Sequence, residues 1–116
     1  MTLPLTIEAL AAAYDYLSEF PPFNKWNMPH SEDVTFKVLK TKDRTAHYAK
    51  IEGGHEIAMS SAYVGSHEML LLSMAHEMTH LHCSQTCWNR RNPHDKAFQK
   101  FADRICKIHR FDRLVF

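Results

Sequence analysis

A short motif, HExxH at residues 76–80, constrains this chain more than any other feature of its sequence. It lies in an apolar, helix-forming run over residues 70–81. On an α-helix, residues four apart lie roughly 40° apart around the axis and about 6 Å apart along it. His76 and His80 therefore share one face, where their imidazole nitrogens can bind a single metal ion. Glu77 is placed beside them to act on a water molecule rather than to bind the metal.

The residues around the motif argue against a purely surface role for this helix. Apolar side chains cover two of its faces, and they include Met69, Leu71, Leu72, Met74, Met78 and Leu81. A helix that is apolar nearly all round is buried. Buried histidines and a buried glutamate are costly unless they are paired or bind a metal. The alternative is a surface helix with two solvated histidines, and it needs a polar face that the sequence hardly provides.

A catalytic zinc site needs a third protein ligand, since three protein groups and a water are the usual set. No glutamate follows Glu77, so a downstream glutamate ligand is excluded. The longer pattern HExxHxxGxxH also fails, because Cys83 stands in place of its glycine and Thr86 in place of its last histidine. Cys83 lies about 10 Å along the axis from His76, too far for one ion on a straight helix. The remaining candidates are His94, Asp95, Asp103 and His109.

His94 is the candidate that the sequence favours. Residues 92–95, Asn-Pro-His-Asp, have the features of a helix start, with Asn as the cap and Pro at the first helical position. His94 then opens an inward-facing stripe at helical spacing that comprises Phe98, Phe101, Ile105 and Ile108. His94 could also be a core-edge histidine with an ordinary hydrogen bond. Beside a motif that lacks one ligand, we favour a role in metal binding.

These residues resemble the SprT-like zinc metallopeptidases, which include spartan, the eukaryotic DNA–protein crosslink protease, and small bacterial and phage-borne relatives. The resemblance rests on His-Glu-Met-Thr-His-Leu-His at 76–82 and on His-Asp-x-x-Phe-x-x-x-Ala-Asp-x-Ile-Cys at 94–106. The strand-like residues 57–60 before the motif also match, and the similar region spans about residues 45–110. In that family the third ligand is a histidine that opens the next helix, usually in His-Gly-x-x-Phe. Here Asp95 replaces the glycine.

The resemblance implies a zinc metalloendopeptidase in which His76, His80 and His94 bind one Zn²⁺ and Glu77 is the general base for a zinc-activated water. It also implies a protein or peptide substrate. Spacing does not choose among several candidates for a second oxyanion donor, which are Tyr48, Tyr63, His55 and the arginines of residues 83–92. The alternative function is a zinc-stabilised module that binds DNA or protein and has no proteolytic activity.

The remaining patterns predict an α+β fold in one domain, residues 1–116. A first helix follows Thr6, and three strands over 34–39, 45–51 and 56–60 form a sheet of antiparallel type. A turn at 41–44 and a Gly-Gly hairpin separate the strands. The motif helix begins after Ser66 and ends near His82. A polar loop over 83–92 leads to a last helix from about Pro93 to His109.

Composition and charge bound the setting in which the chain works. With 45% hydrophobic and 23% charged residues, the chain has an ordinary composition for a soluble domain. It has neither a run of transmembrane length nor the marks of a secretory signal. Three cysteines suit reduced thiols in the cytoplasm better than a disulfide framework.

The charge is uneven along the chain. Residues 1–33 contain one lysine and five acidic residues, whereas residues 88–116 contain eight Lys or Arg and three Asp. Such a basic end can bind nucleic acid phosphates weakly and without sequence preference. The candidate contacts are Arg90, Arg91, Lys96, Lys100, Arg104 and Lys107. A solvated helix face, with cations favourably placed near the helix C-terminus, is the alternative explanation.

Overall fold

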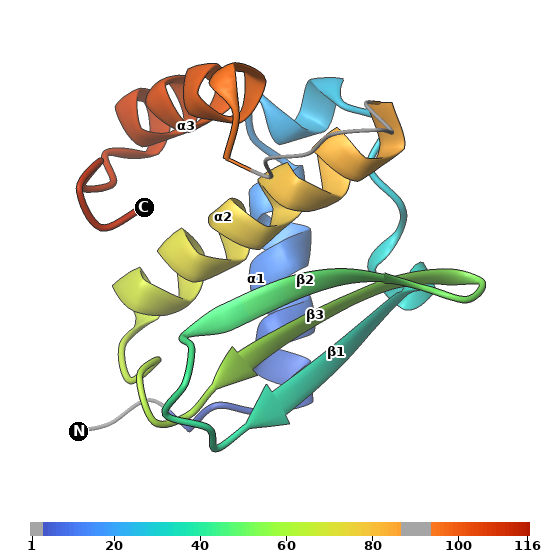
Figure 1. Ribbon diagram of the computed structural model, residues 1–116, viewed down its shortest axis with the longest axis vertical. Coiled ribbons are helices and arrows are strands. Elements are labelled where there is room, and N and C mark those ends of the chain that lie inside the picture. Colours follow the sequence, from blue (N-terminus) through green and yellow to red (C-terminus); the bar gives the residue numbers. More distant parts are fainter. Residues whose placement is uncertain (1–3, 87–93) are drawn as a thin grey trace.

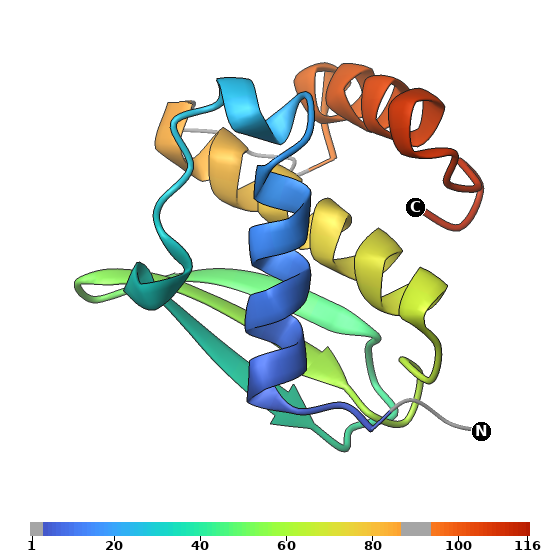
Figure 2. The same ribbon diagram turned by 180° about the vertical axis from the view of Figure 1, so that it is seen from behind.

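A computed structural model describes residues 4–86 and 94–116. Three helices and a three-stranded sheet give the α+β fold that the sequence predicts. The elements are α1 (Ile7–Ser18), β1 (Val34–Leu39), β2 (Ala46–Ile51), β3 (Gly54–Ser60), α2 (His67–Thr86) and α3 (Lys96–His109), with short 3₁₀ turns at Phe23–Lys25 and Ser31–Asp33. Helices α1 and α2 pack on each other and on the sheet, and α3 packs on α2 away from the sheet (Figures 1 and 2).

The sheet is mixed, so the expected antiparallel type is wrong for one of its two pairings. β3 lies between the other two strands, antiparallel to β2 and parallel to β1. The predicted Gly-Gly hairpin joins β2 to β3, and Gly53 adopts a positive φ of 80° there. Residues 40–45 do not form a tight hairpin turn. They cross the gap of about 9–10 Å, two strand spacings, into which β3 inserts.

The helix ends differ from the prediction where tertiary packing overrides local signals. Ser66 does cap α2, since its hydroxyl accepts a hydrogen bond from the Met69 amide at 3.1 Å. However, α2 continues to Thr86, because Cys83 is buried and keeps the helix packed beyond His82. Helix α3 begins at Lys96 and not at Pro93, with Asp95 as its cap. The expected cap, Asn92, lies with Pro93 outside the described residues.

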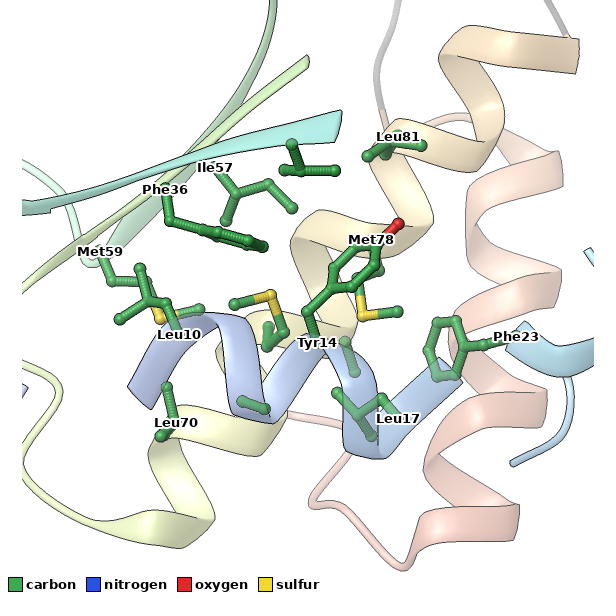
Figure 3. Close-up of a cluster of buried hydrophobic side chains, with 14 of the residues drawn as sticks. Leu10, Tyr14, Leu17, Phe23, Phe36, Ile57, Met59, Leu70, Met78 and Leu81 are labelled. Carbon is green, nitrogen blue, oxygen red and sulfur yellow. The ribbon is translucent and has the colours of Figure 1, made fainter. Parts of the chain in front are cut away.

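One hydrophobic cluster joins α1, the sheet and α2 (Figure 3). The fully buried side chains include Leu10, Tyr14 and Leu17 of α1, Ile57 and Met59 of β3, and Met74, Met78 and Leu81 of α2. Each large apolar side chain contributes roughly 1.5–3 kcal/mol when it is removed from water. The side of α2 that faces this cluster is therefore tightly held, which fixes the direction of its remaining side.

Helix α3 is held on α2 through a narrower stripe. Phe98, Ala102 and Ile105 are buried, but Ile108 is 41% exposed, which corrects its predicted inward position. At the far end of α2, the indole of Trp26 stacks on His82 with ring centroids 3.9 Å apart.

Within the described residues, we find no helix with the length and apolar character needed to cross a membrane.

Candidate metal centre

Three histidines meet in a triangle between α2 and the start of α3. The Nε2 atom of His80 lies 3.1 Å from that of His76 and 3.2 Å from that of His94, and the third side measures 3.4 Å. Three nitrogens that bind one ion tetrahedrally at ~2.0–2.1 Å stand about 3.3–3.4 Å apart. The structure therefore brings His76, His80 and His94 together in an arrangement that fits a single metal ion.

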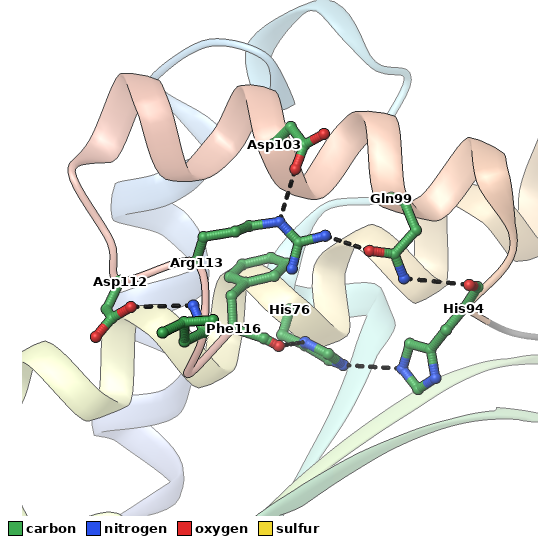
Figure 4. A network of polar contacts seen from close by, with 8 residues as sticks. His76, His94, Gln99, Asp103, Asp112, Arg113 and Phe116 are labelled. Carbon is green, nitrogen blue, oxygen red and sulfur yellow. Dashed lines mark hydrogen bonds and ion pairs between the residues drawn. The ribbon is translucent and has the colours of Figure 1, made fainter.

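The protonation pattern of His76 also fits a ligand. Its Nδ1–H donates a hydrogen bond to the main-chain oxygen of Phe116 at 2.9 Å (Figure 4). A neutral imidazole that donates through Nδ1 has a lone pair on Nε2, and that lone pair faces the triangle. Burial first, and then the charge of His94, lowers the pKa of His76 to about 4, although the Phe116 oxygen acts in the opposite direction. His76 is therefore neutral at neutral pH and need not lose a proton to bind a cation.

Phe98 of α3 packs against all three histidine rings. Its ring stacks on His80 with centroids 4.5 Å apart, and it contacts His76 at 5.1 Å and His94 at 4.9 Å. Phe98 is itself buried, as part of the stripe that joins α3 to α2. The packing of the two helices thus fixes the ring planes, which limits the directions in which the three nitrogens can point.

The sequence pattern predicted that His94 lies in the first turn of the last helix. In the structure, His94 lies just before α3, which begins at Lys96. The carboxylate of Asp95 accepts a hydrogen bond from the Phe98 amide at 3.1 Å, which caps the helix immediately after His94. The main-chain oxygen of His94 accepts a hydrogen bond from the Gln99 side chain at 3.2 Å. The cap and this hydrogen bond set where the exposed His94 side chain leaves the chain.

Glu77 is buried beside the triangle. It is 6% exposed, and burial raises the pKa of its carboxyl to about 8. A cavity of about 180 Å³ adjoins it. The lining comprises Thr45, Ala46, Met69, Leu72, Ser73, His76, Glu77, Val115 and Phe116. A buried carboxyl group at the wall of a small cavity next to the histidine triangle can exchange a proton with a molecule that enters the cavity.

The other candidates for the third ligand have different partners. Asp95 caps α3, and Asp103 accepts a hydrogen bond from Arg113 Nε at 2.8 Å. His109 donates from Nε2 to the Pro21 carbonyl oxygen at 2.9 Å. None of these three side chains belongs to the histidine triangle.

Three of the candidate oxyanion donors, Tyr48, His55 and Tyr63, are among the described residues, and none of these three lines the cavity beside Glu77. The Tyr63 hydroxyl donates to the Lys42 carbonyl oxygen. The Tyr48 hydroxyl is hydrogen-bonded to His55 Nδ1 at 2.6 Å, toward the C-terminal end of α2. The arginines predicted for this role, Arg90 and Arg91, lie outside the described residues.

The candidate nucleic-acid contacts divide between two parts of the chain. Arg90 and Arg91 cannot be placed, because they fall outside the described residues. Lys96, Lys100, Arg104 and Lys107 are all exposed on α3, and their spacing puts them along one side of that helix. They form a basic stripe that faces away from the buried stripe of Phe98, Ala102 and Ile105.

Three contacts of the site were not foreseen from the sequence. They involve the side chain of Gln99, the guanidinium of Arg113 and the main-chain oxygen of Phe116 (Figure 4). A main-chain oxygen has no signature in a sequence, and Gln99 reads as an ordinary exposed helical residue. The aromatic residues at 111 and 116 were the one available signal, since both pack against the core.

Comparison with known proteins identifies the family to which this chain belongs. No curated protein sequence matches the chain. A family model described as SprT-like family does match, over residues 13–114. This span includes α2, α3 and the three histidines, and it extends the resemblance beyond the motif region to nearly the whole chain. The chain therefore belongs to the SprT-like family.

Proposed function

We propose that this chain is a zinc-dependent metalloendopeptidase that acts as a single domain over residues 1–116. The observation that carries the proposal is the triangle of Nε2 atoms, 3.1–3.4 Å on a side, next to the buried carboxyl group of Glu77. Membership of the SprT-like family is in keeping with this chemistry. We also propose a cytoplasmic location, because three cysteines suit reduced thiols better than a disulfide framework.

His76, His80 and His94 would hold the metal ion. Imidazole nitrogen suits several transition metals, and three histidines with one position open to water or substrate are typical of catalytic zinc. When bound there, Zn²⁺ would polarise the scissile carbonyl and lower the pKa of a water molecule toward ~7. The Phe116 oxygen and the Phe98 ring hold the imidazoles in position for this role.

Glu77 is the proposed general base. It accepts a proton from the attacking water and then delivers that proton to the nitrogen of the departing amine, so the carboxyl group ends in its starting state. Burial favours the protonated carboxyl, whereas a nearby cation favours the carboxylate. These opposing influences suit a group that must gain and lose a proton near neutral pH.

The substrate would approach along β2. This strand pairs with β3 on one side, and Ala46 at its start lines the cavity beside Glu77. Among the described residues, no strand pairs with the opposite edge of β2. An extended peptide can add to such an edge through main-chain hydrogen bonds. The proposed arrangement would bring a peptide bond near Glu77 without requiring a particular sequence.

A second candidate function is DNA binding through the basic stripe of α3. Its four exposed cations, Lys96, Lys100, Arg104 and Lys107, favour contact with phosphates. This binding could accompany proteolysis, or it could replace it if the zinc site is only structural. The two cases differ in whether Glu77 has a chemical role.

The test is to incubate zinc-loaded protein with an unfolded protein substrate, with and without single-stranded DNA. Wild type should cleave the substrate and Glu77→Gln should not. Glu68→Gln makes the same change at an exposed position in the first turn of α2, and it should cleave like wild type. Equal cleavage by wild type and Glu77→Gln, or no cleavage by wild type under any of these conditions, would overturn the proposed activity.

A further inference from the structure

Residues 110–116, which we call the strap, turn back from the end of α3 toward α2 (Figures 1 and 2). Arg110 ends α3 in the left-handed conformation at φ 60°, and this reverses the chain direction. The amides of Val115 and Phe116 then donate to the Asp112 main-chain oxygen at 3.1 Å each. The resulting turn directs residues 113 and 116 toward the histidine triangle.

The strap contacts His76 through Phe116. Besides the 2.9 Å hydrogen bond from His76 Nδ1 to the Phe116 oxygen, the Phe116 ring lies against the His76 ring with centroids 5.0 Å apart. The same ring packs on Phe98 at 6.2 Å. The packing of the Phe116 ring on His76 itself and on Phe98, which also contacts the His76 ring, thus helps to hold this oxygen in place.

The strap also reaches His94, through Arg113. The Arg113 guanidinium donates to Asp103 at 2.8 Å and to the side-chain oxygen of Gln99 (Figure 4). The Gln99 amide nitrogen donates in turn to the main-chain oxygen of His94 at 3.2 Å. A chain of hydrogen bonds therefore runs from the strap to the backbone of the third histidine.

We propose that the strap is part of the metal centre, with Arg113 and Phe116 as positioning residues for His94 and His76. The inference rests on the proposed metal site. It adds that the strap orients two of the three ligands, His76 and His94. Partners that orient ligating histidines reduce the freedom these side chains would lose on binding. Metal affinity and closure of the strap should therefore be linked, each favouring the other.

The exposure of the strap argues against a role confined to the hydrophobic core. Leu114 is 97% exposed and Val115 is 53% exposed, although both are apolar. Phe111 and Phe116 do pack against the core. In addition, Arg113 and Phe116 make the contacts that lead to the histidines. The Arg113–Asp103 ion pair is itself exposed, so its loss should scarcely change the stability of the metal-free fold.

The test measures two properties of each variant. They are the zinc affinity, by competition with a chelator, and the visible absorption spectrum of the Co²⁺-substituted protein. Arg113→Ala and Phe116→Ala should each weaken zinc binding about 10–100-fold, the usual effect of removing an orienting partner. Both should change the Co²⁺ spectrum, while the melting temperature of the metal-free protein should change little for Arg113→Ala. Arg113→Lys should restore affinity only in part, because one ammonium cannot reproduce the planar fork of the guanidinium.

Two matched controls separate positioning from general effects of the strap or of charge. Leu114→Ala alters the exposed residue between the two anchors, and Arg104→Ala removes one exposed positive charge from α3. Both should keep wild-type zinc affinity. Hydrogen exchange at the Val115 and Phe116 amides should slow when zinc is added to wild type and should not slow in His94→Ala.

The outcomes distinguish this inference from the proposed function. Wild-type zinc affinity and an unchanged Co²⁺ spectrum in both Arg113→Ala and Phe116→Ala would overturn the inference and leave the peptidase proposal intact. A metal-free melting temperature that falls in step with affinity in Arg113→Ala would also overturn it, because the role would then be structural. Failure of the wild type to bind zinc would overturn both proposals.

Discussion

Helices α2 and α3 both contribute to the histidine triangle, but they do so in different ways. Ten of the twenty residues of α2 are buried, against four of the fourteen residues of α3. α2 holds His76 and His80 within its own turns and packs on α1 and the sheet. α3 is amphipathic, packs chiefly on α2, and has His94 only at its entrance. The centre thus joins a rigid half to a half that depends on longer-range contacts.

This difference shows how a metal site can be divided between local and distant structure. The nitrogens of His76 and His80 come together because the helix repeat places both side chains on one face of α2. The packing of α2 on the core fixes the direction of that face. His94 reaches them through a helix cap, the Gln99 hydrogen bond and the strap. Mutations that disturb α2 should therefore affect the whole fold, whereas mutations around α3 should affect mainly the metal.

The largest expected effect concerns Glu77, which belongs to the rigid half but is not a proposed ligand. Glu77→Gln keeps the size of the side chain and removes its ability to accept a proton. Hydrolysis should fall on the order of 10²–10⁴-fold, while zinc content by metal analysis stays at the wild-type value. Loss of zinc from this variant would show that Glu77 binds the metal. The division of the ligands, with two from α2 and one from the start of α3, would then be wrong.

His94→Ala tests whether the half of the centre that belongs to α3 supplies the third ligand. We expect it to lose tight, stoichiometric zinc, with affinity falling by more than the ~10–100-fold typical of an orienting partner. The metal-free protein should remain folded, since His94 is exposed. His109→Ala, the matched change at the other end of α3, should keep its zinc. Tight one-to-one zinc in His94→Ala would move the third ligand to another residue.

A pair of core changes compares the two helices in stability alone. Leu81 of α2 is fully buried, and Leu81→Ala should lower the free energy of unfolding by about 2–5 kcal/mol through the cavity it leaves. Ile108 of α3 is 41% exposed, so Ile108→Ala should cost within about 0.5 kcal/mol. Chemical denaturation of the metal-free proteins measures both. Equal losses would contradict the picture of one rigid and one loosely held helix.

The smallest expected effect concerns the exposed side of α3. If its basic stripe binds DNA, Lys96→Ala with Lys100→Ala should reduce the slope of log affinity against log salt by about 2, roughly 0.9 per lost phosphate contact. The matched double variant, Lys40→Ala with Lys42→Ala, removes two exposed charges beside the sheet and should leave the slope unchanged. Binding that is absent at low salt, or that does not depend on salt, would exclude this role for the stripe.

Much of the secondary structure was predictable because local signals agreed with burial. The hydrophobic spacing and the Ser66 cap predicted the start of α2, and the hairpin at Gly53 was readable from its two glycines. The predicted end of α2 and the predicted start of α3 were wrong. The polar residues after His82 suggested an earlier end for α2, but the burial of Cys83 outweighs them. Pro93 suggested an earlier start for α3, but Asp95 caps the helix. Helix ends depend on such contacts more than helix interiors do.

The order of the strands is a second feature that only the tertiary structure decided. Three consecutive strands with turn signals between them suggest a simple antiparallel arrangement. Residues 57–60 of β3 are all buried, including Ala58 and Ser60, which suits a central strand with a neighbouring strand at each edge. Their small side chains fit that position, but nothing in the local pattern says that β1 must lie parallel to β3.

The sequence by itself determined the pairing of His76 with His80 and the place of Glu77 beside them, because the repeat of an α-helix is a local property of the chain. It also named His94 as the best third member, but by elimination. Only the tertiary structure decided how His94 comes within 3.2 Å of His80 and that Phe116, forty residues from His76, supplies an oxygen to it. Contacts of this kind arise when separate elements pack together, and a main-chain oxygen leaves no trace in the sequence.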